Sequence, residues 1–209
     1  LISVAIDPNF AENSFFYLGV SVSRETNVIR RYQLNSADYE ATYESEVLVI
    51  RVTGEGSRRP WHNVGSIGFT EEGYLWALFG DKVLDDEAQN PHSLLGKVLR
   101  IIPEEGPEGG YTVPQDNPFA DGTGHPAVYA MGLRSPWKAA YSDGRWFISD
   151  VGLDTYEEVN RLEGPGQNFG WPLHEGPCED SCGETSPPWV HYGRGSSAPF
   201  VQDDVDATA

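Results

Sequence analysis

Short runs of alternating apolar and polar residues recur along the whole chain, and Gly, Pro, Asp or Asn separates each run from the next. Runs of about four to eight residues that are rich in β-branched and aromatic side chains are typical of strands. No stretch predicts an amphipathic helix longer than two turns, so the expected fold class is all-β. The predicted strands are 2–6, 15–22, 27–34, 46–52, 64–69, 74–79, 97–102, 127–131, 137–141, 145–150 and 157–162.

Two segments, 72–81 and 143–150, resemble each other. Each has an acidic residue and a Gly, then an apolar strand that contains an aromatic residue and ends in Asp. Each follows another predicted strand, so the unit is a hairpin with Gly in its turn. This long repeat suits a four-stranded propeller blade with an insertion, although a β-sandwich also contains short alternating strands. In a propeller, Asp81 and Asp150 would face the same central cavity.

The charge of the chain excludes two classes of partner. The 209 residues include 14 Lys and Arg against 32 Asp and Glu, which gives a net charge of −18. A nucleic-acid-binding surface needs clustered cations, and an anionic membrane surface would repel this chain. No apolar run is long enough to span a bilayer, and no signal peptide is recognised. The acidity suits a well-hydrated surface or carboxylates that bind Ca²⁺, and the length suits one domain.

Cys178 and Cys182 lie in a polar loop with no further Cys in the chain. Because tetrahedral zinc needs four ligands, this pair makes a poor zinc site. The pair favours a small disulfide in an oxidising compartment, with two free thiols as the alternative. His92, His125, His174 and His191 share no ligand spacing and are expected at the surface.

A series of motifs, read in order, resembles the glucose/sorbosone dehydrogenase family of soluble aldose sugar dehydrogenases. Any one motif is weak evidence, whereas the ordered set is specific. The motifs are ISVAIDPNF at 2–10, HNVG at 62–65 with EGYL at 72–75 and GD at 80–81, SLLGKVLRI at 93–101, DNPF at 116–119, YAMGLRSPW at 129–137, DVG at 150–152, EEVN at 157–160 and NFGWP at 168–172.

The resemblance implies a six-bladed β-propeller of the quinoprotein glucose dehydrogenase type. It covers only the first half of such a propeller, about three blades. We therefore expect residues 1–194 to form a partial propeller and residues 195–209 to be an acidic tail or the start of a missing region. Because the chain opens on Leu1, it reads as a piece of a longer protein. Open propeller arcs expose strand edges, so missing blades or another domain would complete the fold.

The resemblance also implies oxidation of aldose sugars at C1, with pyrroloquinoline quinone (PQQ) and Ca²⁺ as cofactors and an unknown electron acceptor. His62 matches the general base, whose ordinary pKa near neutrality suits proton abstraction. Asp81 matches the carboxylate that orients the imidazole. A secreted protein, extracellular or periplasmic, is expected.

The cofactor contacts are also implied by the resemblance. Arg134 matches the arginine that binds the quinone carboxylates, since its planar fork suits them. Ser135 and Trp137 follow it in the same cofactor-binding segment. Gly152 and Leu153 match the residues whose main-chain carbonyls hold the Ca²⁺. An ordinary salt bridge for Arg134 and a turn for Gly152 are the alternatives.

Three departures from the family pattern matter. Trp137 follows Pro136 as in the aldose-dehydrogenase branch but not in the best-known glucose dehydrogenases, and the other two put the activity in question. Val64 stands where Gly is usual and adds bulk beside His62, and Ser135 replaces an Asn that contacts the cofactor. The Asp85–Glu87 cluster is expected to solvate a loop, or to assist calcium binding. The alternative function is a non-catalytic extracellular propeller module similar to hedgehog-interacting proteins, which share a Cys-containing loop after the Gly-Trp motif. A structural domain of a matrix protein is a third hypothesis.

Overall fold

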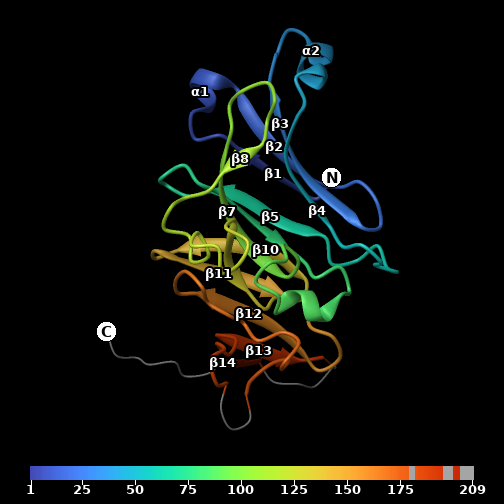
Figure 1. The fold of residues 1–209 in the computed structure, drawn as a ribbon, viewed down its shortest axis with the longest axis vertical. Helices are drawn as coiled ribbons and strands as arrows, with labels where there is room; N and C mark the ends of the chain where they lie inside the picture. The colour runs from blue at the N-terminus through green and yellow to red at the C-terminus, as the bar shows by residue number, and fades with distance from the viewer. Residues whose placement is uncertain (179–181, 195–199, 203–209) are drawn as a thin grey trace.

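Three antiparallel sheets follow one another along the chain in the computed structural model (Figure 1). The structure describes residues 1–178, 182–194 and 200–202. The first sheet has the order β1-β2-β3-β4. Its strands are β1 (Ser3–Ile6), β2 (Phe15–Ser21), β3 (Thr26–Gln33) and β4 (Val47–Thr53).

In the second sheet, β5-β6-β7 pair in order and β9 pairs with β7, while the short β8 pairs with the far end of β7. These strands are β5 (Val64–Phe69), β6 (Leu75–Phe79), β7 (Lys97–Pro103), β8 (Tyr111–Thr112) and β9 (Val128–Met131). The third sheet has the order β10-β11-β12-β13-β14. Its strands are β10 (Pro136–Ser142), β11 (Arg145–Asp150), β12 (Tyr156–Leu162), β13 (Val190–Gly193) and β14 (Phe200–Gln202).

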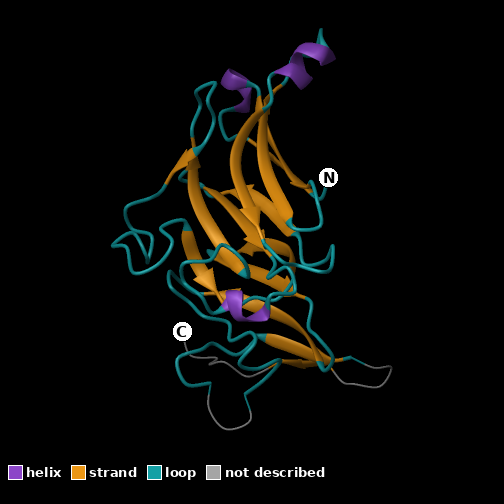
Figure 2. Ribbon diagram, turned by 45° about the vertical axis from the view of Figure 1, so that its right-hand side comes forward, coloured by secondary structure: helices purple, strands orange, loops and turns teal. Residues whose placement is uncertain are grey.

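Helical structure is confined to short connections (Figure 2). Helix α1 (Phe10–Asn13) precedes β2, and α2 (Tyr39–Glu44) precedes β4. The carboxylate of Asp38 accepts the backbone N–H of Ala41 and so caps α2. A 3-10 helix, η1 (Asp85–Ala88), lies between β6 and β7. Within the described residues, no helix has the length and apolar composition that crossing a membrane requires.

Apolar side chains fill the two spaces between consecutive sheets. One buried cluster joins residues of the first and second sheets, among them Tyr17, Ile29 and Phe79. The other joins the second and third sheets and includes Trp76 and Ile148. Strand β5 contacts both β1 and β10, so the first strands of the three sheets lie next to one another. Each sheet is therefore covered by its neighbour, as in successive propeller blades.

The predicted strands are all present, and β5 and β11 have the predicted bounds. The two similar segments supply the turn and the second strand of the hairpins β5–β6 and β10–β11. These hairpins are the first two strands of the second and third sheets. Strands β8, β13 and β14 were not predicted. Strand β14 pairs with β13 and thus continues the third sheet. The division at residue 195 stays a prediction, since 195–199 and 203–209 lie outside the described residues.

Candidate active site

An open cleft of about 540 Å³ lies where β5 and β10 begin. It brings together most of the predicted site residues, from segments that are far apart in the sequence. Asp81 lies beneath the cleft and is completely buried. The residues that line the cleft are Pro60, Trp61, His62, Asn63, Arg134, Ser135, Trp137, Val151, Gly152, Leu153 and Arg194.

His62 and Asp81 form a buried pair at the floor of the cleft. The Nδ1 atom of His62 lies 2.5 Å from Oδ1 of Asp81, and the two side chains are 8% and 0% exposed. A carboxylate at this distance accepts a proton held on Nδ1, so the geometry assigns that proton to Nδ1. Nε2 is then the basic atom of the ring. The pair therefore has the geometry of an oriented general base.

Asp81 is itself held by its own turn and by groups from two other segments. The indole N–H of Trp171 donates to its Oδ2 at 2.8 Å, and the backbone N–H of Val83 donates to its Oδ1 at 2.7 Å. The backbone N–H of Asp81 donates to the carbonyl of Arg134 at 2.9 Å. Sequence reasoning assigned no contact to Trp171, although the motif at 168–172 marked its segment.

The backbone of His62 is constrained by the neighbouring Gly80. His62 has φ of 48°, in the left-handed region that non-glycine residues rarely adopt. A Cβ atom at Gly80 would lie 2.6 Å from both the carbonyl carbon and the carbonyl oxygen of His62. Only a glycine lets the two backbones approach so closely. Gly80 therefore fixes the conformation from which His62 reaches Asp81.

We expect Gly80→Ala to lower the free energy of unfolding by about 2 kcal/mol, because the new methyl group overlaps the backbone of His62. Thermal unfolding followed by circular dichroism measures the change. The control is Gly106→Ala, where an added Cβ meets nothing within 4 Å. Equal stability of the two variants would show that the backbone of His62 can accommodate a methyl group at position 80.

A second carboxyl group, that of Asp85, lies close to Asp81. Burial and repulsion by the Asp81 carboxylate raise the pKa of Asp85. Asp85 begins η1 and is exposed, and the sequence predicted that its cluster would solvate a loop or assist calcium binding. Its approach to Asp81 was not predicted. The contact between Asp85 and Asp81 forms because η1 approaches the end of β6. The acidic composition of the segment alone does not indicate it.

Arg134 lines the same cleft as His62. Its Nη1 donates to the carbonyls of Val151 at 2.9 Å and Gly152 at 2.7 Å, and its guanidinium lies 5.3 Å from the ring centroid of Trp171. The Nε atom of Arg134 is buried and has no hydrogen-bond partner in the described part of the chain. The structure thus offers a positively charged group with one unsatisfied donor at the cleft.

The two carbonyl oxygens predicted as calcium ligands both accept hydrogen bonds from guanidinium groups. Arg134 donates to Gly152 at 2.7 Å, and Nη1 of Arg194 donates to Leu153 at 2.6 Å. Arg194 also pairs with Glu157 at 2.6 Å. Two positive charges directly on these oxygens would repel a divalent cation. As arranged here, Gly152 and Leu153 do not fit a calcium ion.

Asp150 supports the cleft from below without lining it. Its carboxylate accepts the backbone N–H groups of Arg134 at 2.8 Å and Ser135 at 2.6 Å. Burial and repulsion by Glu158 raise the pKa of Asp150. Asp81 and Asp150 therefore hold the 134–135 backbone from two sides, and neither faces the open cavity as the repeat suggested.

The departures from the family pattern have different consequences in the structure. Val64 is completely buried in the core between the first two sheets, where it faces Gly19. It does not line the cleft, so the expected bulk beside the base is absent there. Ser135 is 9% exposed, and the ring of Trp137 is half-exposed at the cleft. Ser135 and Trp137 thus line the cleft together with Arg134, as predicted from the motif.

The predicted disulfide is confirmed, because Cys178 and Cys182 are joined. Nε2 of His174 lies 3.8 Å from Sγ of Cys178 and 2.7 Å from the hydroxyl of Thr185. The expectation that His191 lies at the surface is wrong. His191 is buried in β13 and packs edge-on against Tyr156, because β13 pairs with β12.

Comparison with known proteins gives one consistent result. Residues 1–200 match the family described as Glucose / Sorbosone dehydrogenase. The HIPL1 protein of Arabidopsis thaliana is 36% identical over 171 residues, which are 72% of this chain and 24% of that protein. The Hedgehog-interacting protein of Mus musculus is 28% identical over 155 residues, which are 67% of this chain and 22% of that protein.

Among solved structures, the PQQ-bound aldose sugar dehydrogenase of Streptomyces coelicolor superposes with a TM-score of 0.74 at 29% identity. The match covers 91% of this chain and 52% of that one. The chain therefore spans about half the length of this structure and less of the curated relatives. The predicted all-β propeller fold is confirmed by these matches.

Proposed function

Because the chain belongs to the glucose/sorbosone dehydrogenase family, we propose that it is about three blades of a PQQ-dependent enzyme that oxidises aldose sugars at C1. The observation that carries this proposal is the buried His62–Asp81 pair at the floor of a cleft that also holds Arg134. The activity belongs to the whole propeller, of which this chain supplies the base and part of the cofactor site.

The cleft suits a quinone that carries several carboxylates. Its volume of about 540 Å³ falls in the range of cofactor sites. Arg134 and Arg194 both line it, and guanidinium groups bind carboxylates with paired hydrogen bonds. Ser135 and the half-exposed ring of Trp137 would contact the rest of the cofactor.

The residues of the chain would handle the proton of the reaction. Nε2 of His62 would accept the proton of the sugar C1 hydroxyl, since Nδ1 already donates to Asp81. The Asp81 carboxylate would stabilise the resulting imidazolium and preserve the tautomer. PQQ bound in the cleft would supply the two-electron acceptor for the hydride from C1. Calcium enters no step here, because guanidinium groups occupy the carbonyls of Gly152 and Leu153.

A non-catalytic extracellular binding module is the second candidate. Its support is the similarity to the Hedgehog-interacting protein together with the disulfide loop that follows Trp171. Secretion would suit both candidates, because a structural disulfide persists in oxidising compartments.

Reconstitution distinguishes the two candidates. The purified protein, as this chain and joined to the remaining blades of the proposed propeller, is mixed with PQQ, with and without Ca²⁺. Quinone binding is measured by absorbance, and dye reduction is assayed with several aldoses. We expect quinone binding by both forms and aldose-dependent dye reduction by the longer one. A protein that binds no quinone in either form would be a binding module instead.

Arg134→Met is expected to lower the affinity for PQQ at least tenfold, because it removes a charged donor from a carboxylate-binding site. Titration with the quinone measures the change. The control is Arg145→Met, which removes a charge from an exposed position on β11 outside the cleft. Equal affinities of the two variants would exclude Arg134 from the cofactor site.

A further inference from the structure

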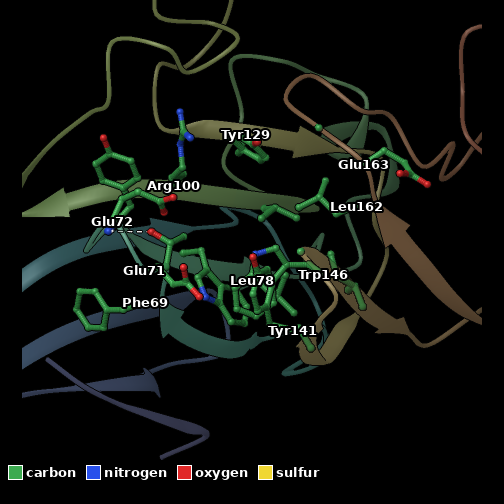
Figure 3. A pocket seen from close by; sticks show the side chains of 18 of the residues that line it. Phe69, Glu71, Glu72, Leu78, Arg100, Tyr129, Tyr141, Trp146, Leu162 and Glu163 are labelled. Atoms are coloured by element: carbon green, nitrogen blue, oxygen red, sulfur yellow. Dashed lines mark hydrogen bonds between the residues drawn. The ribbon is translucent and has the colours of Figure 1, made fainter. Parts of the chain in front are cut away.

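A second cleft, of about 430 Å³, opens between the second and third sheets (Figure 3). Its rim includes Glu71 and Glu72, in the turn between β5 and β6, and Gly144, in the turn between β10 and β11. The candidate active site lies where β5 and β10 begin, whereas these turns follow their last residues. The two clefts are therefore at opposite ends of the same strands and share no lining residue.

Aromatic rings from both sheets form much of the wall of this second cleft. The ring centroids of Trp76 and Trp146 are 4.0 Å apart, and those of Tyr141 and Trp146 are 4.9 Å apart. Figure 3 shows Tyr141 and Trp146 together beside Leu78, which lies deeper on β6. Tyr141 is 52% exposed, so part of this aromatic surface is open to a ligand.

The charges around the second cleft are unbalanced. Among the described residues, Arg100 is the one cation that lines it, and its Nη2 pairs with Asp116 at 2.6 Å. The Arg100 guanidinium also lies 4.6 Å from the ring centroid of Tyr129, so it is fully engaged within the protein. Glu163 forms ion pairs with Arg145 and Arg161.

Two lining carboxylates form no ion pair among the described residues. Glu71 and Glu72 are exposed at the rim, and neither forms an ion pair within residues 1–178, 182–194 and 200–202. The cleft thus combines exposed aromatic surface with two exposed carboxylates that form no ion pair, although Thr70 and Arg100 interact with that of Glu72. An organic cation gains from both, through attraction to aromatic faces and to carboxylates. A neutral sugar donates hydroxyl hydrogen bonds to carboxylates but carries no charge that they attract. An anion is repelled.

We propose that this second cleft binds a small organic ammonium compound whose apolar body packs against Tyr141 and Trp146 while its charge lies near Glu71 and Glu72. The site is formed entirely by blades within the described chain. It is also independent of the proposed sugar oxidation, because none of its residues lines the active-site cleft.

Calorimetric titration of the 209-residue chain with benzyltrimethylammonium tests the proposal, with benzyl alcohol as the neutral analogue and benzoate as the anionic one. We expect the cation to bind at least tenfold more tightly than either analogue. The double variant Glu71→Gln/Glu72→Gln should lose about tenfold in affinity for the cation. Tyr141→Leu should lose several-fold through the aromatic contact.

The matched control is Glu40→Gln/Glu44→Gln, which removes two exposed carboxylates from α2, far from the cleft in sequence and outside its lining. Its affinity should stay within about twofold of the parent chain. Equal binding of benzyl alcohol and the cation, or equal affinity of the two double variants, would overturn the proposal. Binding of glucose without binding of the cation would also overturn it and assign the cleft to sugars.

Discussion

Replacing His62 by Ala is expected to lower the rate of aldose oxidation about a thousandfold, because it removes the only base at the floor of the active-site cleft among the described residues. Asp81→Asn should cost about a hundredfold or more. Its amide can donate a proton to Nδ1 and so place the imidazole proton on Nε2, the wrong atom. Steady-state dye reduction by the full propeller measures both effects.

The matched control is His92→Ala, which removes an exposed imidazole from a loop outside both clefts. It should retain the parent rate. The affinity for PQQ should change little in His62→Ala, which separates loss of the base from loss of the cofactor. If His62→Ala oxidised aldoses at the parent rate, the base would be another group and the assignment of this site would fail.

Local patterns predicted most of the strands, because alternation of apolar and polar residues is a property of the strand itself. Strand β5 is the clearest case, with its bounds set by the turn signals on either side. Strand β13 was missed for the opposite reason. Its four residues are set by pairing with β12, where His191 lies opposite Glu158 across a long intervening loop. The buried position of His191 follows from that pairing and from no local pattern.

In the candidate site, too, contacts between distant segments could not be predicted from local patterns. The resemblance marked His62, Asp81 and Arg134, and the structure places all three around one cleft or directly beneath it. The support of Asp81 by Trp171 joins segments 90 residues apart, which no spacing rule would connect. The calcium expectation was carried by the resemblance alone. It stays a prediction, and no local pattern could show that the guanidinium of Arg134 donates to the carbonyl of Gly152 in the folded chain.

The sequence marked Lys97 only as part of a motif. In the structure, its side chain holds η1 in place below the active-site cleft. It is completely buried, and its Nζ donates to the carbonyls of Glu87 at 2.7 Å, Ala88 at 2.9 Å and Leu95 at 2.6 Å. Glu87 and Ala88 belong to η1, which also carries Asp85 toward Asp81. Lys97 thus ties η1 to the start of β7.

Lys97→Met is expected to lower the free energy of unfolding by about 3 kcal/mol at neutral pH, because three buried carbonyls lose their donor while the volume is kept. Burial lowers the pKa of Lys97 to about 7 from its ordinary value of 10.5. Between these values the unfolded chain binds the proton, whereas the folded chain holds a neutral amine whose two N–H bonds reach two of the three carbonyls. The contribution of Lys97 to stability therefore rises with pH across this window, by on the order of 1 kcal/mol per pH unit.

Denaturant unfolding at pH 6 and at pH 9 measures both effects, and the gap between the parent chain and Lys97→Met should widen at pH 9. Lys138→Met, at an exposed position on β10, is the control and should change stability by less than about 0.5 kcal/mol at either pH. A gap that is the same at both values would mean that Lys97 keeps its proton in the folded chain. A gap near zero at both would mean that water replaces Nζ at the three carbonyls, and η1 would then owe its position to the packing of Ala88 instead.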